Sequence, residues 1–222
     1  MILDLGLIDY EEAYKIQREM VARRKLGEIG DTLILAEHNS VFTFGRMGRR
    51  ENLLVDEGYL QGRGIKVLNI DRGGDITFHG PGQLVVYPVI DLKEKWRDLH
   101  KYMRNLEEVA IKFLQRYSVQ SERHPGKTGV WVGPKKIGSV GIGVDNWVTY
   151  HGLSINIKVD LDFFNMIYPC GLKGVTMVSL DRLVDKDVDM EEAKETILSV
   201  FDSVFNSGKI YFSSAYTVEM KP

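Results

Sequence analysis

The sequence predicts an α+β fold, in which helices pack on one mixed and largely antiparallel β-sheet. Candidate strands outnumber candidate helices, and many neighbouring strands are separated by only a few residues, too few for helical crossovers. The 222 residues contain no repeat, low-complexity run or Pro/Ser-rich linker. A chain of this length can bury a sizeable core, so we expect a single domain over residues 1–222.

Three segments show the periodicity or the capping residues of helices. Asp9 can cap a helix from Tyr10 to about Lys25. Apolar residues recur at spacings of three and four from Leu99 to Leu114, which predicts the strongest helix. Asp189 is expected to open a third helix that ends near Gly208.

Eight segments have the composition or alternation of strands and are bounded by turn residues. These predicted strands are Thr32–Glu37, Val41–Phe44, Lys66–Asp71, Gln83–Ile90, Gly129–Val132, Lys136–Val144, Trp147–Ile157 and Ile210–Ser213.

Composition argues against several classes of function. Twenty-nine basic and 31 acidic side chains give a net charge of −2, so no global field draws the protein onto nucleic acid or a membrane. The longest apolar runs, such as Leu84–Ile90, are too short to span a bilayer, and we expect no signal peptide. A single cysteine leaves no internal disulfide and fits a reducing compartment, so we expect a cytoplasmic protein. Neither HExxH nor histidines at metal spacing occur, so we expect no metal site.

The first candidate site segment is Arg72–Gln83, in which five of twelve residues are Gly or Pro. We expect a tight, irregular connection between two strands, where glycines let the backbone approach a ligand closely. The alternative is a surface turn with incidental polar residues. Neither GxxxxGK[ST] nor GxGxxG after a strand is present, so the segment is not a nucleotide motif.

The second segment, Lys136–Gly143, is a predicted strand thinned by three glycines, against which an acyl chain or a neighbouring helix could pack. Lys135 and Lys136 point to opposite faces of an extended strand, so at most one of them faces a site on a given side. The alternative for either lysine is a solvated side chain.

The third segment, His151–Asn156, has alternating character, and His151 either binds substrate or is satisfied inside a sheet. The fourth contains Cys170, which Pro169 and Gly171 place on a turn where a thiol can be presented to a cleft. The alternative for Cys170 is a small buried hydrophobe. A papain-like arrangement of Cys170 with His79 or His151 and Asn156 is conceivable, but the signatures around such cysteines are absent.

Taken together, these motifs resemble the octanoyl-[acyl-carrier-protein]:protein N-octanoyltransferases, the lipoyl(octanoyl) transferases of lipoate biosynthesis. The resemblance runs from about Phe42 to Leu180, roughly two thirds of the chain. The motifs that carry it, in the family's order and approximate spacing, are Arg72-Gly73-Gly74 with Thr77-Phe78-His79-Gly80-Pro81-Gly82-Gln83, Lys136-Ile137 with Gly141, His151-Gly152-Leu153 with Asn156, and Pro169-Cys170-Gly171.

The resemblance implies one domain related to biotin and lipoate protein ligases, and a reaction that moves octanoyl from acyl carrier protein to a lysine of a lipoyl domain. The family's acyl-thioester cysteine falls on Cys170, and the lysine that lowers its pKa falls on Lys136. Phe78 stands where Tyr is common in the family, which removes a hydroxyl group beside the expected pocket. Ser154 stands where Ala is common, which adds one. The substrate-contacting segments fall on Arg72, Gly73, Gly74, Asp75, Ile76, Thr77, Phe78, His79, Ser139, Val140, Gly141, Gly152, Leu153 and Ser154.

These assignments predict a ping-pong reaction. The ammonium of Lys136 would stabilise the Cys170 thiolate, and the thiolate would attack the carrier thioester. Backbone N–H groups near the Cys170 turn could stabilise the oxyanion. Once Cys170 is acylated, Lys136 loses its partner charge and can accept a proton from the incoming amine. Thioester exchange is nearly isoenergetic, so we expect no ATP or other cofactor.

The implied partners are octanoyl-acyl carrier protein as donor, and lipoyl domains of 2-oxoacid dehydrogenase E2 subunits and the glycine cleavage H protein as acceptors. The resemblance also implies a monomer. An acidic carrier would need a local basic patch, for which Arg46 with Arg49 and Arg50, and the run Arg23–Lys25, are candidates.

Three alternative functions remain: an ATP-dependent lipoate or biotin ligase, a thiol hydrolase or amidase that uses Cys170, and a non-catalytic domain that binds acyl carrier protein.

Overall fold

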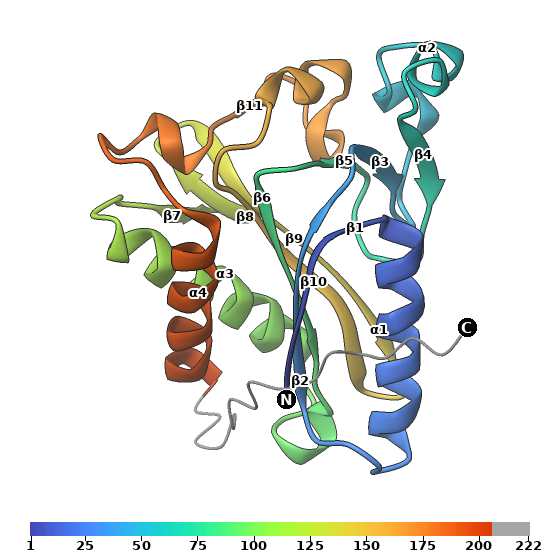
Figure 1. Cartoon of the computed structure of the whole chain (residues 1–222), viewed down its shortest axis with the longest axis vertical. Helices are drawn as coiled ribbons and strands as arrows, with labels where there is room; N and C mark the ends of the chain where they lie inside the picture. The colour runs from blue at the N-terminus through green and yellow to red at the C-terminus, as the bar shows by residue number, and fades with distance from the viewer. Residues whose placement is uncertain (206–222) are drawn as a thin grey trace.

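The computed structural model describes residues 1–205, which form two β-sheets covered by helices (Figure 1). The predicted α+β class is confirmed, as is the mixed and largely antiparallel character of the main sheet. The predicted strand Ile210–Ser213 and the predicted helix end near Gly208 lie outside the described residues. Within residues 1–205, no helix is long and apolar enough to cross a membrane.

The main sheet has eight strands, and most neighbouring pairs are antiparallel. Parallel pairing occurs between β1 and β2 at one edge and between β11 and β9. Sequence patterns did not predict strand β1, which lies at the edge of the sheet, or strands β7 and β11, which are very short. The spatial order is β1 (Ile2–Ile8), β2 (Thr32–His38), β6 (Gln83–Val89), β10 (Val148–Asn156), β9 (Lys135–Asp145), β8 (Lys127–Val132) and β7 (Glu122–His124), and β11 (Thr176–Met177) pairs with β9 off this path.

The second sheet has three strands, β4 (Lys66–Asn69), β3 (Val41–Phe44) and β5 (Ile76–His79). The expectation of an irregular connection throughout Arg72–Gln83 was therefore wrong for Ile76–His79, which pairs antiparallel with β3. This stretch contains β-branched and aromatic residues, which favour strands, but the glycines on both sides hid the signal.

The three predicted helices are confirmed as α1 (Tyr10–Lys25), α3 (Leu99–Arg116) and α4 (Met190–Phe205). Asp9 caps α1 by accepting a hydrogen bond from the N–H of Glu11 at 2.9 Å, and Asp189 accepts from the first turn of α4. One short helix was missed, α2 (Glu57–Gln61). Short 3₁₀ helices occur at Arg50–Asn52, Leu92–Glu94, Leu161–Met166, Pro169–Gly171 and Leu180–Arg182.

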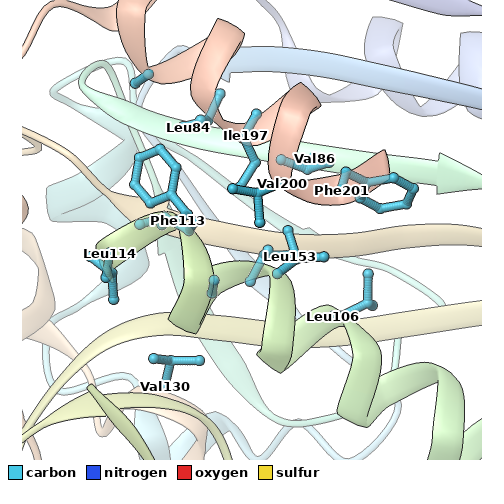
Figure 2. Packing of buried hydrophobic residues seen from close by; sticks show 14 of the residues in the cluster. Leu84, Val86, Leu106, Phe113, Leu114, Val130, Leu153, Ile197, Val200 and Phe201 are labelled. Carbon is cyan, nitrogen blue, oxygen red and sulfur yellow. The ribbon is translucent and has the colours of Figure 1, made fainter. Parts of the chain in front are cut away.

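Helices cover both faces of the main sheet. On β6, Leu84 and Val86 belong to the apolar cluster under α3 and α4, whereas Val85 and Tyr87 belong to the cluster under α1. This division follows the alternation of side chains along a strand. In Figure 2, side chains of α3 and α4 meet those of the sheet within the first cluster. The result is a three-layer arrangement, with α1 opposite α3 and α4 (Figure 1).

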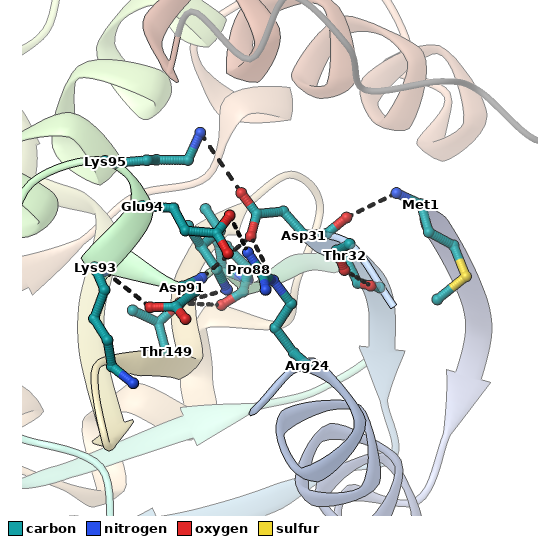
Figure 3. A network of polar contacts seen from close by, with 12 residues as sticks. Met1, Arg24, Asp31, Thr32, Pro88, Asp91, Lys93, Glu94, Lys95 and Thr149 are labelled. Atoms are coloured by element: carbon teal, nitrogen blue, oxygen red, sulfur yellow. Dashed lines mark hydrogen bonds and ion pairs between the residues drawn. The ribbon is translucent and has the colours of Figure 1, made fainter. Parts of the chain in front are cut away.

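A polar network fixes the end of α1 to the start of β2 and to the segment that follows β6 (Figure 3). The buried guanidinium of Arg24 donates to Asp31 Oδ1 at 3.0 Å and to Glu94 Oε2 at 2.6 Å. Asp31 also accepts from the N–H of Asp91, and its backbone carbonyl accepts from the amino group of Met1. These bonds lock α1 against the sheet, and Tyr10, at its other end, lines the pocket described next.

Candidate active site

Cys170 lies on the tight turn that the sequence predicts. Its backbone is left-handed, with φ 57°, and Gly171 follows with φ 71°. The turn is closed by hydrogen bonds from the N–H of Gly171 to Tyr168 O at 2.8 Å and from the N–H of Leu172 to Pro169 O at 3.1 Å. A left-handed non-glycine residue is strained, and such strain often marks a functional position. The N–H groups of Gly171 and Leu172 are both used within the turn, so they are poor candidates for the expected oxyanion donors.

Asp75 supports this turn from the neighbouring loop. Its carboxylate accepts hydrogen bonds from Asn52 Nδ2 at 2.6 Å and from the N–H of Arg49 at 3.1 Å. A Cβ atom on Gly171 would lie 2.8 Å from Asp75 Oδ2, so only glycine allows the turn to approach this closely. Asp75, expected to contact substrate, does not line the pocket and supports the turn instead.

Lys136 reaches the thiol of Cys170 from β9. Its Nζ atom donates to Cys170 Sγ at 3.1 Å, and its side chain is buried, with the residue 1% exposed. Lys135 is exposed, so the prediction that the two lysines point to opposite faces is confirmed. The route to Cys170 passes over Gly129, where an added Cβ would lie 2.6 Å from Lys136 Cε.

The electrostatics favour a thiolate at Cys170. Burial raises the pKa of the thiol, but the charge and the hydrogen bond of Lys136 lower it, and Arg72 and Ser139 lower it further. The net effect holds the pKa of Cys170 below its ordinary value. A lowered pKa increases the share of the thiolate, which is the nucleophilic form of cysteine.

A pocket of about 430 Å³ opens beside Cys170, within the size range of small-molecule sites. It lies between the loop that follows β4, strand β5 and the middle of β9 and β10. The predicted residues that line it are Arg72, Gly73, Gly74, Thr77, His79, Ser139, Val140, Gly141, Gly152, Leu153, Ser154 and Cys170.

Besides Asp75, three predicted residues lie outside the pocket wall. Ile76 and Phe78 belong to the second apolar cluster, and the ring of Phe78 stacks on Phe163 with centroids 4.4 Å apart. Because side chains alternate along β5, Thr77 and His79 face the pocket instead. Phe78 therefore does not line the pocket, and its contact with substrate stays a prediction. Lys136 is buried behind Cys170 and does not line the pocket.

The glycines of β9 face different neighbours. A Cβ on Gly141 would lie 3.1 Å from Gly73 O and 3.2 Å from Arg72 Cδ, on the pocket side. A Cβ on Gly138 would instead meet Val130 and Ala110, toward α3. Of the two explanations for a thinned strand, a helix therefore accounts for Gly138, and the pocket wall accounts for Gly141.

Arg72 places a second buried cation in the pocket wall. Its Nη2 atom donates to Thr43 O at 2.7 Å and to Thr43 Oγ1 at 3.0 Å, and Nη1 donates to Gly73 O at 3.0 Å. The Nε atom is buried and has no hydrogen-bond partner among the described residues. The positive charge of Arg72 lowers the pKa of Cys170.

The histidines near the pocket are held by other partners. His151 Nε2 donates to Asp71 Oδ1 at 2.9 Å, and His79 Nδ1 donates to Gln83 Oε1 at 2.7 Å. Burial lowers the pKa of both imidazoles. His151 is therefore satisfied within the sheet, as one of its two interpretations predicts, although it also lines the pocket. The group beside Cys170 Sγ is Lys136, which does not fit the papain-like alternative.

Several pocket residues carried no sequence signal. Tyr10 and Tyr87 are buried at the pocket, with Tyr87 donating to His38 Nε2 at 2.6 Å. They belong to a helix and a strand whose patterns predicted core positions only. Met47, Met103 and Lys127 also line the pocket but lie in segments that no motif covers.

The fold defines a class of protein shared with lipoate protein ligases. A putative lipoate protein ligase of T. acidophilum with bound lipoic acid superposes with a TM-score of 0.71, covering 92% of this chain and 85% of that one. Lipoate-protein ligase A bound with ATP superposes with a TM-score of 0.72, covering 92% and 85%. Sequence identities of 16% and 14% mean that these likenesses show the fold alone.

Sequence comparison identifies the family. Residues 9–202 match the model of the lipoyl protein ligase A/B catalytic domain. An octanoyltransferase of Rubrobacter xylanophilus is 45% identical over 90% of both chains, and one of Maridesulfovibrio salexigens is 44% identical over 91% of this chain and 95% of the relative. The chain belongs to the lipoyl protein ligase A/B catalytic domain family, and the resemblance seen in its motifs is confirmed.

Proposed function

We propose that this enzyme is an octanoyltransferase that carries the acyl group on Cys170 as a thioester and delivers it to a lysine of a lipoyl domain. The observation that carries the mechanism is the 3.1 Å contact between Lys136 Nζ and Cys170 Sγ beside a pocket of about 430 Å³. Relatives at 44–45% identity carry the name octanoyltransferase, which supports octanoyl as the group transferred.

The first half-reaction acylates Cys170. The thiolate attacks the carbonyl carbon of the octanoyl thioester, and a C–S bond forms as the carrier C–S bond breaks. The positive charge of Arg72, which lines the pocket and lowers the pKa of Cys170, would help to stabilise the oxyanion of the tetrahedral intermediate. Lys136 gives a proton to the departing carrier thiolate, so the acyl-enzyme holds a neutral amine behind the thioester.

The second half-reaction transfers the acyl group to nitrogen. The acceptor lysine, as a free amine, attacks the Cys170 thioester carbonyl, and the C–N bond forms as the C–S bond breaks. Lys136 accepts the proton that the nitrogen loses and restores the ammonium–thiolate pair. Each residue thus returns to its starting state after one turnover.

Neither half-reaction needs an added energy source. The first exchanges one thioester for another, and the second converts a thioester to a more stable amide. The proposed activity therefore requires no ATP, whereas a ligase that starts from a free acid must first activate it. We propose that the donor is octanoyl-acyl carrier protein, and that the acceptors are lipoyl domains of 2-oxoacid dehydrogenase E2 subunits and of the glycine cleavage H protein. We further propose that the enzyme acts as a cytoplasmic monomer with one domain over residues 1–222.

The test is to mix the protein with octanoyl-acyl carrier protein, without nucleotide, and to weigh the intact protein. Cys170 is the single cysteine, so an octanoyl adduct reports this residue directly. We expect an adduct that disappears when a lipoyl domain is added, with a matching mass gain on that domain. Release of free octanoate would identify a hydrolase, and dependence on ATP and free octanoate would identify a ligase.

A further inference from the structure

The ammonium of Lys136 is buried with few partners. Its one hydrogen bond within residues 1–205 goes to Cys170 Sγ, and no carboxylate of this part of the chain forms an ion pair with it. A buried ammonium is unfavourable unless groups around it stabilise its charge, and one hydrogen bond satisfies only part of it. Another group must hold the end of this flexible side chain in place.

The indole ring of Trp131 also lies beside this ammonium. The Nζ atom of Lys136 lies 5.8 Å from the centre of the ring, within the range of cation–π attraction. Trp131 is directly opposite Lys136 in the register of β8 and β9, and it is 1% exposed. The face of a tryptophan ring carries partial negative charge, so it attracts a cation without itself gaining or losing a proton.

The ring is itself held in position. His124 stacks on it, with centroids 4.6 Å apart and planes 5° apart, and Lys127 Nζ lies 5.3 Å from its centre. On the same strand, Gly129 leaves free the space that the end of Lys136 occupies, since a Cβ there would lie 3.1 Å from Nζ. The ring of Trp131 and the space above Gly129 therefore restrict the end of the Lys136 side chain to a position beside the Cys170 thiol.

We propose that Trp131 is a positioning residue for Lys136, whose aromatic face keeps the ammonium beside Cys170 Sγ. The proposal rests on the roles given above to Lys136 and Cys170. It adds that the partial negative charge on the ring face, and not only the volume of the ring, holds the Lys136 ammonium where it stabilises the Cys170 thiolate.

The first test compares Trp131→Leu with Trp131→Phe by the rate of iodoacetamide alkylation across pH. Cys170 is the single cysteine, so the rate reports its thiolate whether or not the protein transfers acyl groups. We expect Trp131→Leu to shift the profile to higher pH and to lower the rate at neutral pH by about tenfold, as loss of a desolvated cation–π contact predicts. Trp131→Phe keeps an aromatic face and should recover most of the rate. An unchanged profile in a folded Trp131→Leu protein, or equal shifts in both variants, would overturn the proposal.

A second test does not depend on the Leu variant folding. Fluorinated tryptophan withdraws charge from the ring face with little change of shape, and the chain has three tryptophans. We expect the alkylation profile to move to higher pH as fluorination increases. The matched control is Trp131→Phe with the same fluorinated residues at Trp96 and Trp147, in which the profile should not move. If fluorination of the wild-type sequence leaves the alkylation profile unchanged, Trp131 acts by packing alone and the proposal is overturned.

The variant Lys127→Met tests the second cation at the ring. A shift of its alkylation profile as large as that of Trp131→Leu would assign the effect to Lys127 instead.

Discussion

The Nζ atom of Lys136 lies 3.1 Å from the Sγ atom of Cys170, although 34 positions separate the two residues in the sequence. Strand pairing accounts for the contact. After the Cys170 turn the chain enters β11, where Met177 pairs in parallel with Lys136, and the N–H of Val178 donates to the carbonyl of Lys136. The turn is therefore attached to the same strand that supplies the lysine, which fixes the separation of the two reacting groups.

Replacing Cys170 by Ser should abolish transfer and the octanoyl adduct while leaving the fold intact. A hydroxyl beside Lys136 stays protonated at neutral pH and is a weak nucleophile. The measurements are turnover with octanoyl-acyl carrier protein, the intact mass and the melting temperature. If Cys170→Ser keeps more than a few per cent of wild-type turnover, Cys170 is structural and a ligase mechanism gains support.

Replacing Lys136 by Ala should slow both half-reactions and raise the pKa of Cys170, since Lys136 is the largest influence that lowers it. The thiolate forms above this pKa, so the alkylation profile should move to higher pH. We expect kcat/KM to fall by about 10²–10⁴-fold, the usual loss for a group that also transfers protons. Lys135→Ala, which removes an exposed lysine from the same strand, should change neither quantity. Equal effects of the two substitutions would contradict the pairing.

An acidic carrier should dock on exposed cations around the pocket mouth. Arg49 and Lys173 are exposed and lie next in the chain to loops that line the pocket, at Met47 and Leu172. Reversing both charges, with Arg49→Glu and Lys173→Glu, should raise KM for the carrier by about three- to tenfold at low salt, with the effect shrinking as salt rises.

The structure shows that several cations in the two basic runs predicted as docking patches already have partners. Arg50 is already engaged by Glu57 and by the ring of Phe44. In the other run, Arg23 pairs with Glu19 and Glu28. Arg23→Glu with Lys25→Glu is the matched control, because it changes the net charge equally in a segment that does not line the pocket. If the control variant raises KM as much as the Arg49→Glu and Lys173→Glu variant does, the total charge of the protein attracts the carrier, and the cations at the pocket mouth have no special role.

Most of the fold was predictable where local patterns are strong. The periodicity of α3 and the cap at Asp9 predicted helix positions closely, and β3 was predicted to the residue. Strand β5 was missed because its alternation, with Thr77 and His79 on one side and Ile76 and Phe78 on the other, is only four residues long and lies between glycines.

The site was predictable only in part, for the same physical reason. Motif resemblance supplied Cys170 and Lys136, and strand alternation separated Lys136 from Lys135. Trp131 and Tyr87 could not be found, because a buried aromatic residue in a strand has the same sequence pattern whether it faces a core or a site. Their positions depend on strand pairing and register, which no local pattern specifies.

The last prediction concerns the path of the acyl chain along β9. Each buried methylene contributes about 0.8 kcal/mol, so octanoyl should exceed hexanoyl in kcat/KM by roughly fifteen-fold if the pocket holds both extra carbons. The side chain of Gly141→Val would enter the pocket wall, where even its Cβ lies 3.2 Å from Arg72 Cδ. We expect this variant to prefer shorter acyl groups, with the loss growing from hexanoyl to decanoyl because overpacking costs about 1–3 kcal/mol.

The measurement is kcat/KM for butanoyl, hexanoyl, octanoyl and decanoyl thioesters, with Gly141→Ala as a smaller step in the same direction. Gly138→Ala is the matched control on the same strand, because its Cβ would point toward Val130 and Ala110 and away from the pocket. It should keep the wild-type length preference even if it changes stability. If Gly141→Val folds normally and keeps that preference as well, the acyl chain does not run past Gly141. Other lining residues, such as Met103 and Leu153, would then be the next positions to test for contact with the chain.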